Sequence, residues 1–195
     1  ITDLDIFYIL NSQNKSVMVT GSNGKSTTCK IIEHVLKSTN YDISLVGNIG
    51  KPILNIETNK NSLVVIEASS FQLDYSQFIK PNYAIVLNIT NNHLDRHVTM
   101  SNYKKAKFKI FLNQQNTDLA FLDSKNLKKF YKRNNFKGKL INILKKKYGS
   151  IKKKIQNIYL KSKVNDKNMN FVYQLAKEFK VKDYLFVKAS NSFKG

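Results

Sequence analysis

A loop rich in glycine and hydroxyl residues follows the short apolar run at residues 17–19. Its glycines let the backbone turn so that several N–H groups face one anion, and its lysine adds a full positive charge. The loop therefore predicts a phosphate-binding site; the alternative is an ordinary glycine–asparagine turn between a strand and a helix. Ser26 is placed to reach a phosphate-bound Mg²⁺. The predicted phosphate contacts are Gly21, Ser22, Asn23, Gly24, Lys25, Ser26 and Thr27.

The spacing of this loop departs from the common Walker pattern. That pattern has a glycine five residues before the one at position 24, where this chain has Val19. The sequence thus predicts a shortened phosphate loop.

Further polar residues come directly after apolar runs. Glu67 follows residues 63–66, where an oxygen ligand for Mg²⁺ would be needed; a glutamate facing water is the alternative. The hydroxyl and amide side chains of residues 68–74 suit either a polar substrate or a simple turn. Residues 90–97 hold two of the three histidines with an aspartate and an arginine, which favours a site over isolated surface histidines.

Lys107 interrupts the apolar face of a predicted helix. Tyr103, Ala106 and Ile110 share its face by their spacing of three and four residues. The lysine can pair with an acid, it can react with carbon dioxide to give an anionic carbamate, or its ammonium group can reach water from the core. The sequence leaves these alternatives open.

Two asparagines extend the apolar stripe of another predicted helix, at residues 165–179. Asn165 and Asn168 lie toward the start of that stripe. They can cap the helix, or they can bind a ligand such as an adenine or a ribose.

The order of the predicted elements indicates the fold class. Apolar runs at residues 17–19, 43–46, 63–66 and 83–87 alternate with helical patterns, which predicts an α/β domain with a mostly parallel sheet flanked by helices. In such sheets, ligands bind beyond the carboxyl ends of the strands, where the unusual polar residues fall. Residues 119–122 predict another strand and residues 124–133 a helix. Residues 139–160 predict a small antiparallel region of basic strands at an edge.

The composition of the chain limits the number of domains and the kinds of partner. The 195 residues are enough for one main domain. The net charge of +20 would suit a nucleic-acid partner. However, the lysines are dispersed along the chain and accompany many asparagines and isoleucines, which favours a nucleotide-composition bias over a nucleic-acid site. The single Cys29 and the lack of a long apolar run or secretory signal favour a cytoplasmic protein without membrane contact.

At this point, the motifs together resemble the central, ATP-binding domain of the Mur ligase family. The loop at residues 20–28 is similar to that of the family and to that of folylpolyglutamate synthases. The segments at residues 47–50, 67–73, 88–90 and 93–97, followed by Tyr103 and Lys107, narrow the resemblance to the Mur ligases. It is strong for residues 16–112 and weaker afterwards.

The resemblance implies an ATP-dependent ligase that adds D-glutamate to UDP-N-acetylmuramoyl-L-alanine through an acyl phosphate. Lys25 is implied to hold the β- and γ-phosphates. Ser26 and Glu67 are implied to hold one Mg²⁺, and His93 with a carbamylated Lys107 a second. The residues implied to contact the muramoyl-alanine are Asn48 and Ser69, and those implied to contact the adenosine are Asn165 and Asn168. The implied catalytic residues are Lys25, His93 and Lys107.

Some residues depart from the family pattern. Asn92 stands where an aspartate is expected, and Ser162 and Val164 replace a glycine and a histidine. These changes put the second metal site and the adenosine contact in doubt.

The resemblance also implies a division of the chain. Residues 1–14 are expected to be the linker from an N-terminal UDP-binding domain, and residues 15–195 the central domain. A C-terminal domain for D-glutamate is expected outside this chain. The alternatives to a ligase are a nucleotide-binding fragment or pseudoenzyme without activity of its own and, less favoured, an enzyme resembling folylpolyglutamate synthase.

Overall fold

A parallel sheet forms the centre of the structure, which is a computed structural model describing residues 1–90, 94–143 and 145–194. Within these ranges, six strands pair in the order β2-β3-β1-β4-β5-β6, and every pair is parallel. The phosphate loop after β1 therefore lies between the carboxyl ends of β3 and β4. The strands are β1 Lys15–Thr20, β2 Asp42–Gly47, β3 Ser62–Glu67, β4 Tyr83–Val86, β5 Leu119–Leu122 and β6 Lys139–Asn142.

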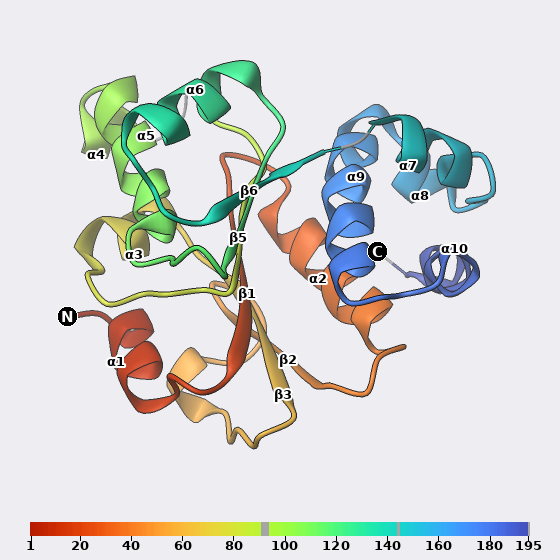
Figure 1. The fold of residues 1–195 in the computed structure, drawn as a ribbon, viewed down its shortest axis with the longest axis horizontal. Helices are drawn as coiled ribbons and strands as arrows, with labels where there is room; N and C mark the ends of the chain where they lie inside the picture. Colours follow the sequence, from red (N-terminus) through yellow and green to blue (C-terminus); the bar gives the residue numbers. More distant parts are fainter. Residues whose placement is uncertain (91–93, 144, 195) are drawn as a thin grey trace.

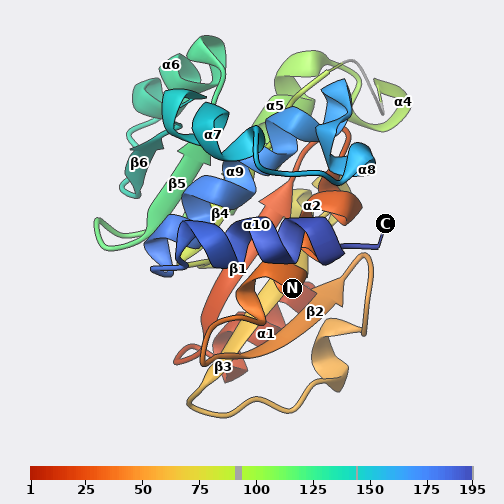
Figure 2. The same ribbon diagram turned by 90° about the vertical axis from the view of Figure 1, so that its right-hand side faces the viewer.

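Helices cover both faces of this sheet (Figure 1). One face carries α1 Asp3–Leu10, α3 Ser70–Tyr75, α4 Leu94–His97, α5 Met100–Phe108 and α6 Lys125–Arg133, with the short 3-10 helices η1 Ile53–Asn55 and η2 Lys109–Phe111. The other face carries α2 Lys25–Leu36, α7 Lys145–Lys152, α8 Ile158–Lys161, α9 Lys163–Glu178 and α10 Asp183–Ser192. Figure 2 looks onto this second face, where α10 crosses in front of the sheet.

The two covered faces explain why the strand sequences are continuously apolar. In β1, Val17 and Val19 belong to the core beneath α2 and α9, whereas Met18 belongs to the core on the opposite face. Side chains alternate along a strand, so a strand that is buried on both sides needs apolar residues at every position. The predicted α/β fold with a mostly parallel sheet is confirmed.

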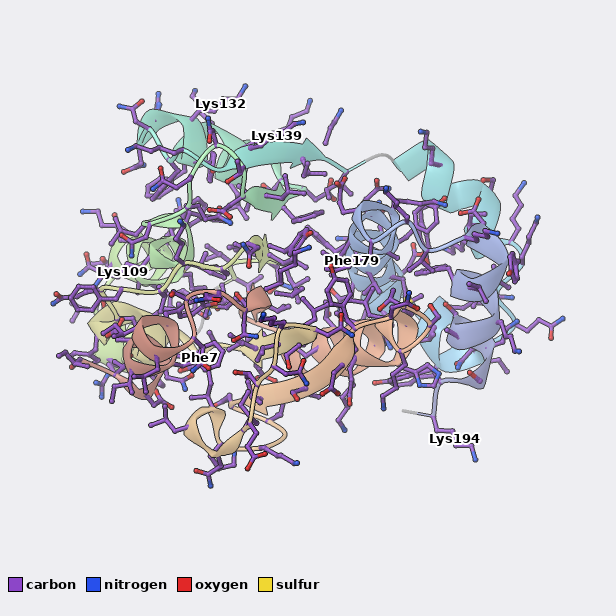
Figure 3. All side chains as sticks on the ribbon, turned by 60° about the horizontal axis from the view of Figure 1, so that its bottom comes forward. Phe7, Lys109, Lys132, Lys139, Phe179 and Lys194 are labelled. Carbon is purple, nitrogen blue, oxygen red and sulfur yellow. The ribbon has the colours of Figure 1, made fainter. Side chains whose placement is uncertain are left out.

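The predicted antiparallel region at residues 139–160 is wrong. β6 does form at the sheet edge, but it runs parallel to β5, and α7 follows it. Tyr148 and Ile151 of α7 are buried in the core with α2 and α9. Their spacing of three residues fits one helical face, which the surrounding lysines obscured in the sequence. In Figure 3, Lys132 and Lys139 point away from the ribbon near this edge, and both are exposed.

The first residues of the chain pack on the sheet as α1. Leu4 and Phe7 are buried, whereas Ile6 is 38% and Leu10 is 74% exposed. The buried pair ties α1 to the core on the α3 and α5 face. Among the described helices, none combines the length and the apolar character that a membrane crossing requires.

Candidate functional site

The phosphate loop connects β1 to α2 through a left-handed glycine. Gly24 precedes the first residue of α2 with a φ of 84°. A Cβ atom at this position would collide with the side-chain amide of Asn168, which comes from α9. Position 24 therefore favours glycine for its backbone angle, and any other residue would also displace the Asn168 amide. The amino end of α2 opens directly onto the loop, as anion binding by a helix requires.

Asn88 fixes the other side of the loop. Its Oδ1 accepts a hydrogen bond from the Asn23 backbone N–H at 3.0 Å, and its Nδ2 donates to the Asn23 carbonyl at 2.9 Å. The Asn88 carbonyl also accepts from the Ser22 N–H at 3.0 Å. This residue shapes the site, although sequence reasoning gave it no role of its own. Its position directly after a buried strand was the available signal.

The Lys25 ammonium group lies over the loop backbone. Its Nζ donates to the carbonyls of Gly21 at 3.1 Å and Ser22 at 3.3 Å. The positive charge is thus held within the loop that was predicted to bind phosphates, in agreement with a phosphate-binding role.

Lys107 is 2% exposed, so the alternative that it reaches water is wrong. Its Nζ donates to the Gly21 carbonyl at 3.0 Å and to Thr20 Oγ1 at 3.3 Å, and no carboxylate of the described residues pairs with it. Burial lowers the pKa of Lys107 to about 7, and the nearby charge of Lys25 acts in the same direction. Burial therefore makes the neutral, nucleophilic amine of this lysine easier to reach than that of an exposed lysine.

Glu67 is buried at the end of β3, so the alternative of a glutamate facing water is wrong. It is 1% exposed, and its Oε2 has no hydrogen-bonding partner among the residues that the structure describes. Its strand neighbour is Val19, immediately before the loop. A buried carboxylate oxygen without a partner is costly, and a bound cation would offset that cost.

The surroundings of Cys29 place this carboxylate beside α2. Burial raises the pKa of the Cys29 thiol, the Glu67 charge raises it further and the Lys25 charge opposes both. Ser26 lies one turn before Cys29 and is half-buried. Ser26 and Glu67 therefore have the donor types and the location that a phosphate-bound Mg²⁺ requires.

A cavity of about 200 Å³ brings four of the predicted residues together. Lys25 and Lys107 line it with Asn48 and Ser69, the two residues expected to contact the acid substrate. Ser69 begins α3, where its Oγ accepts from the Gln72 N–H at 3.1 Å. The cavity is completed by Ser70 and Phe71 of α3.

The two predicted adenosine contacts separate in the structure. Asn168 lines a second hollow, of about 710 Å³, together with Asn23, Asn88 and Val164. Asn165 does not line it; its Nδ2 instead donates to the Tyr159 carbonyl at 2.9 Å, and Ser162 caps the helix. The structure therefore favours a ligand contact for Asn168 and a structural role for Asn165.

The second predicted metal site stays a prediction. His93 and Asn92 lie outside the described residues. Within the described ranges, no three histidine, cysteine, aspartate or glutamate side chains gather as a metal site. Of the histidine-rich segment, His97 is described, and its Nε2 lies 3.0 Å from Ser70 Oγ.

A parallel sheet with a glycine loop and a lysine at the end of its central strand is typical of P-loop nucleotide-binding proteins. The chain belongs to the Mur ligase family, because the family model described as Mur ligase middle domain matches its residues 19–189. The resemblance inferred from the motifs is thereby confirmed.

Individual relatives agree with this assignment. A UDP-N-acetylmuramoylalanine–D-glutamate ligase of Alkaliphilus oremlandii (strain OhILAs) is 40% identical over 130 residues, which make up 66% of this chain and 28% of that protein. The chain thus spans less than a third of that relative's length.

Solved structures share the fold at lower identity. MurF from Acinetobacter baumannii has a TM-score of 0.71 at 17% identity, covering 98% of this chain and 49% of that one. MurF ligase from Thermotoga maritima in complex with ADP has a TM-score of 0.52 at 20% identity, covering 70% of this chain and 36% of that one.

Proposed function

We propose that this chain is the central domain of an ATP-dependent ligase that joins D-glutamate to UDP-N-acetylmuramoyl-L-alanine in peptidoglycan precursor synthesis. The observation that carries the proposal is the buried, unpartnered Oε2 of Glu67 beside a phosphate loop. The names of the 40–44% identical relatives support the choice of amino acid and acceptor. A cytoplasmic location follows from such substrates.

Nucleotide binding is assigned to the loop and its lysine. The N–H groups at the start of α2 and the Lys25 ammonium group would hold the β- and γ-phosphates of ATP. The hollow that Asn168 lines lies next to the loop and would receive the adenosine part. The ADP complex of the Thermotoga maritima MurF ligase, which shares the fold, supports this assignment.

Ser26 and Glu67 would hold Mg²⁺. Bound there, the ion would neutralise charge on the phosphates. The carboxylate of the muramoyl-alanine would attack the γ-phosphorus and displace ADP, and Asn48 and Ser69 would orient this acid in the small cavity. The amine of D-glutamate would then attack the acyl carbon, with loss of a proton and departure of phosphate. Positioning by these side chains is the main catalytic contribution expected of the chain.

Lys107 is assigned a carbamate, as the family resemblance implies. Its neutral amine would attack carbon dioxide to form an N–C bond with release of a proton, and the product carries one negative charge shared by two oxygens. Such a group could serve with His93 as a metal ligand. Labelled ¹³C-bicarbonate should then give a carbamate resonance that is absent from Lys107→Met. Its persistence in that variant would contradict the assignment.

Two measurements test the proposed function. Titration of the chain with Mg-ATP should show saturable binding, and its absence would contradict the nucleotide site. The polypeptide that carries this chain with its flanking domains should convert ATP to ADP over many turnovers, with formation of the amide, only when UDP-N-acetylmuramoyl-L-alanine and D-glutamate are both present. If that polypeptide binds Mg-ATP but forms no amide, the alternative of a nucleotide-binding protein without ligase activity replaces the proposal.

A further inference from the structure

His97 contacts α3 with both an edge and a face of its ring. The residue ends α4 and is 5% exposed. Its Nε2 lies 3.0 Å from Ser70 Oγ, and its ring stacks on Phe71 with a centroid distance of 5.6 Å and an interplanar angle of 10°. Two consecutive residues of the first turn of α3 are therefore held by one imidazole.

The His97 ring also contacts Tyr103, which reaches the phosphate loop. The two ring centroids lie 5.2 Å apart, and Tyr103 is fully buried. The Tyr103 hydroxyl lies 3.1 Å from Ser22 Oγ in the loop, and Ser22 Oγ also accepts from the Thr90 N–H at 2.9 Å. A continuous series of contacts thus runs from the loop through Tyr103 and His97 to α3.

These contacts join the two walls of the small cavity. Ser70 and Phe71 form its α3 wall, and Lys25 and Lys107 form the wall nearest the loop. The Lys107 ammonium group also lies 4.7 Å from the centre of the Tyr103 ring. With only six residues, α3 is too short to be stable by itself, so its position depends on the side chains packed against it.

We propose that His97 is a positioning residue that fixes the Ser70–Phe71 wall against the phosphate loop, so that nucleotide binding at the loop is sensed at α3. This inference rests on the proposed function, because it takes the loop as the nucleotide site. Phosphoryl transfer depends on how closely the acid and the phosphate are held, and an error of about 1 Å can lower the rate by about 100-fold. His97 links the two walls through Tyr103, and we infer that it thereby controls that distance.

The chain offers a matched control. His34 also contacts a serine and a phenylalanine at a distant place: its Nε2 lies 3.0 Å from Ser192 Oγ, and its ring meets Phe193 edge to face, with a centroid distance of 5.6 Å and an interplanar angle of 72°. Arg96 also rests on the Phe71 ring at 5.0 Å, so α4 and α3 share a contact that substitution of His97 does not itself remove.

The test compares amide hydrogen exchange of α3 in wild type, His97→Phe, His97→Gln, Ser70→Ala and His34→Phe, with and without Mg-ATP. His97→Phe keeps the ring contact and loses the hydrogen bond, so the amides of residues 73–76 should exchange about tenfold faster. Mg-ATP should slow this exchange in wild type and not in His97→Phe, while the affinity for Mg-ATP changes less than twofold. His97→Gln, which can still reach Ser70, should restore much of the response.

Several outcomes would overturn the proposal. Unchanged exchange of α3 in both His97→Phe and Ser70→Ala would do so, as would an equal effect of His34→Phe on α3. A loss of Mg-ATP affinity as large as the change at α3 would show that His97 only supports the fold. If wild type does not bind Mg-ATP at all, the proposed function fails, yet exchange in the free chain still tests the contact between His97 and α3.

Discussion

The two ends of the sheet both carry lysines and a hollow, but they differ in chemistry. At the amino ends of the strands, a hollow of about 670 Å³ is lined by Lys15, Lys60, Lys182 and the aromatic ring of Tyr41. At the carboxyl ends, the cavity between Lys25 and Lys107 has only about 200 Å³. The hollow of about 710 Å³ that Asn168 lines also lies at the carboxyl ends, so the size of a hollow does not distinguish the two ends of the sheet.

Two lysines, one at each end of the sheet, differ in the direction in which their pKa values are shifted. A hydrogen bond to the Tyr41 hydroxyl, at 2.7 Å, raises the pKa of the exposed Lys15. Burial lowers the pKa of Lys107 to about 7. The first environment keeps an ordinary ammonium ion, and the second produces a reactive amine. Desolvation of charged groups, rather than the size of a hollow, therefore marks the functional end of this sheet.

The largest expected difference between the two ends is in nucleotide affinity. Lys25→Ala should raise the dissociation constant for Mg-ATP by about 10- to 100-fold, because it removes a charge-assisted contact to phosphate. The matched variant at the other end, Lys15→Ala, should leave it unchanged. Isothermal titration calorimetry of both variants checks this. Equal losses would show that general positive charge, and not the loop, binds the nucleotide.

The next effect concerns the carboxylate that lacks a partner. Glu67→Gln removes a buried charge and should stabilise the chain by about 1–2 kcal/mol in the absence of ligands. The same change should weaken the dependence of nucleotide binding on Mg²⁺. Urea unfolding and titrations with and without Mg²⁺ measure the two effects. A destabilised variant would mean that the Glu67 carboxylate is already satisfied in the free chain.

A third effect, confined to one pH window, is a pH dependence of stability. The pKa of Lys107 is about 7 in the folded chain, below its ordinary 10.5, so the unfolded chain binds more protons between these values. Stability should therefore rise with pH across this window, by at most about 1.4 kcal/mol per pH unit from this group. Lys107→Met should lose this rise relative to wild type. Urea unfolding of both proteins at pH 7 and pH 9, in buffer free of carbon dioxide, checks the difference, and parallel changes would contradict it.

Much of the fold was predictable because its strands are buried on both faces. The apolar runs of β1, β3 and β4 indicate that these strands are buried. The glycines and Lys25 indicate the loop between β1 and α2. The segment that forms α7 was mispredicted because lysines dominate its sequence, while its buried face is marked by Tyr148 and Ile151.

The sequence predicted which residues belong to the site, but it did not predict which of them contact one another. Glu67 and Lys107 stood out because charged residues interrupt apolar patterns. The contacts of Asn88 with the loop, and of His97 with Ser70, join residues that are distant in the sequence and depend on how the strands are ordered. No local pattern carries such information, so these roles needed the structure.

The contact between Gly24 and Asn168 has a consequence for how the protein is made. The phosphate loop belongs to the first strand and helix of the sheet, whereas Asn168, whose amide packs against Gly24, belongs to α9 near the end of the chain. During synthesis, the loop emerges from the ribosome long before α9 does. A domain completes its packing only when all of its elements have emerged. We therefore expect a nascent chain to acquire its full nucleotide site late in synthesis.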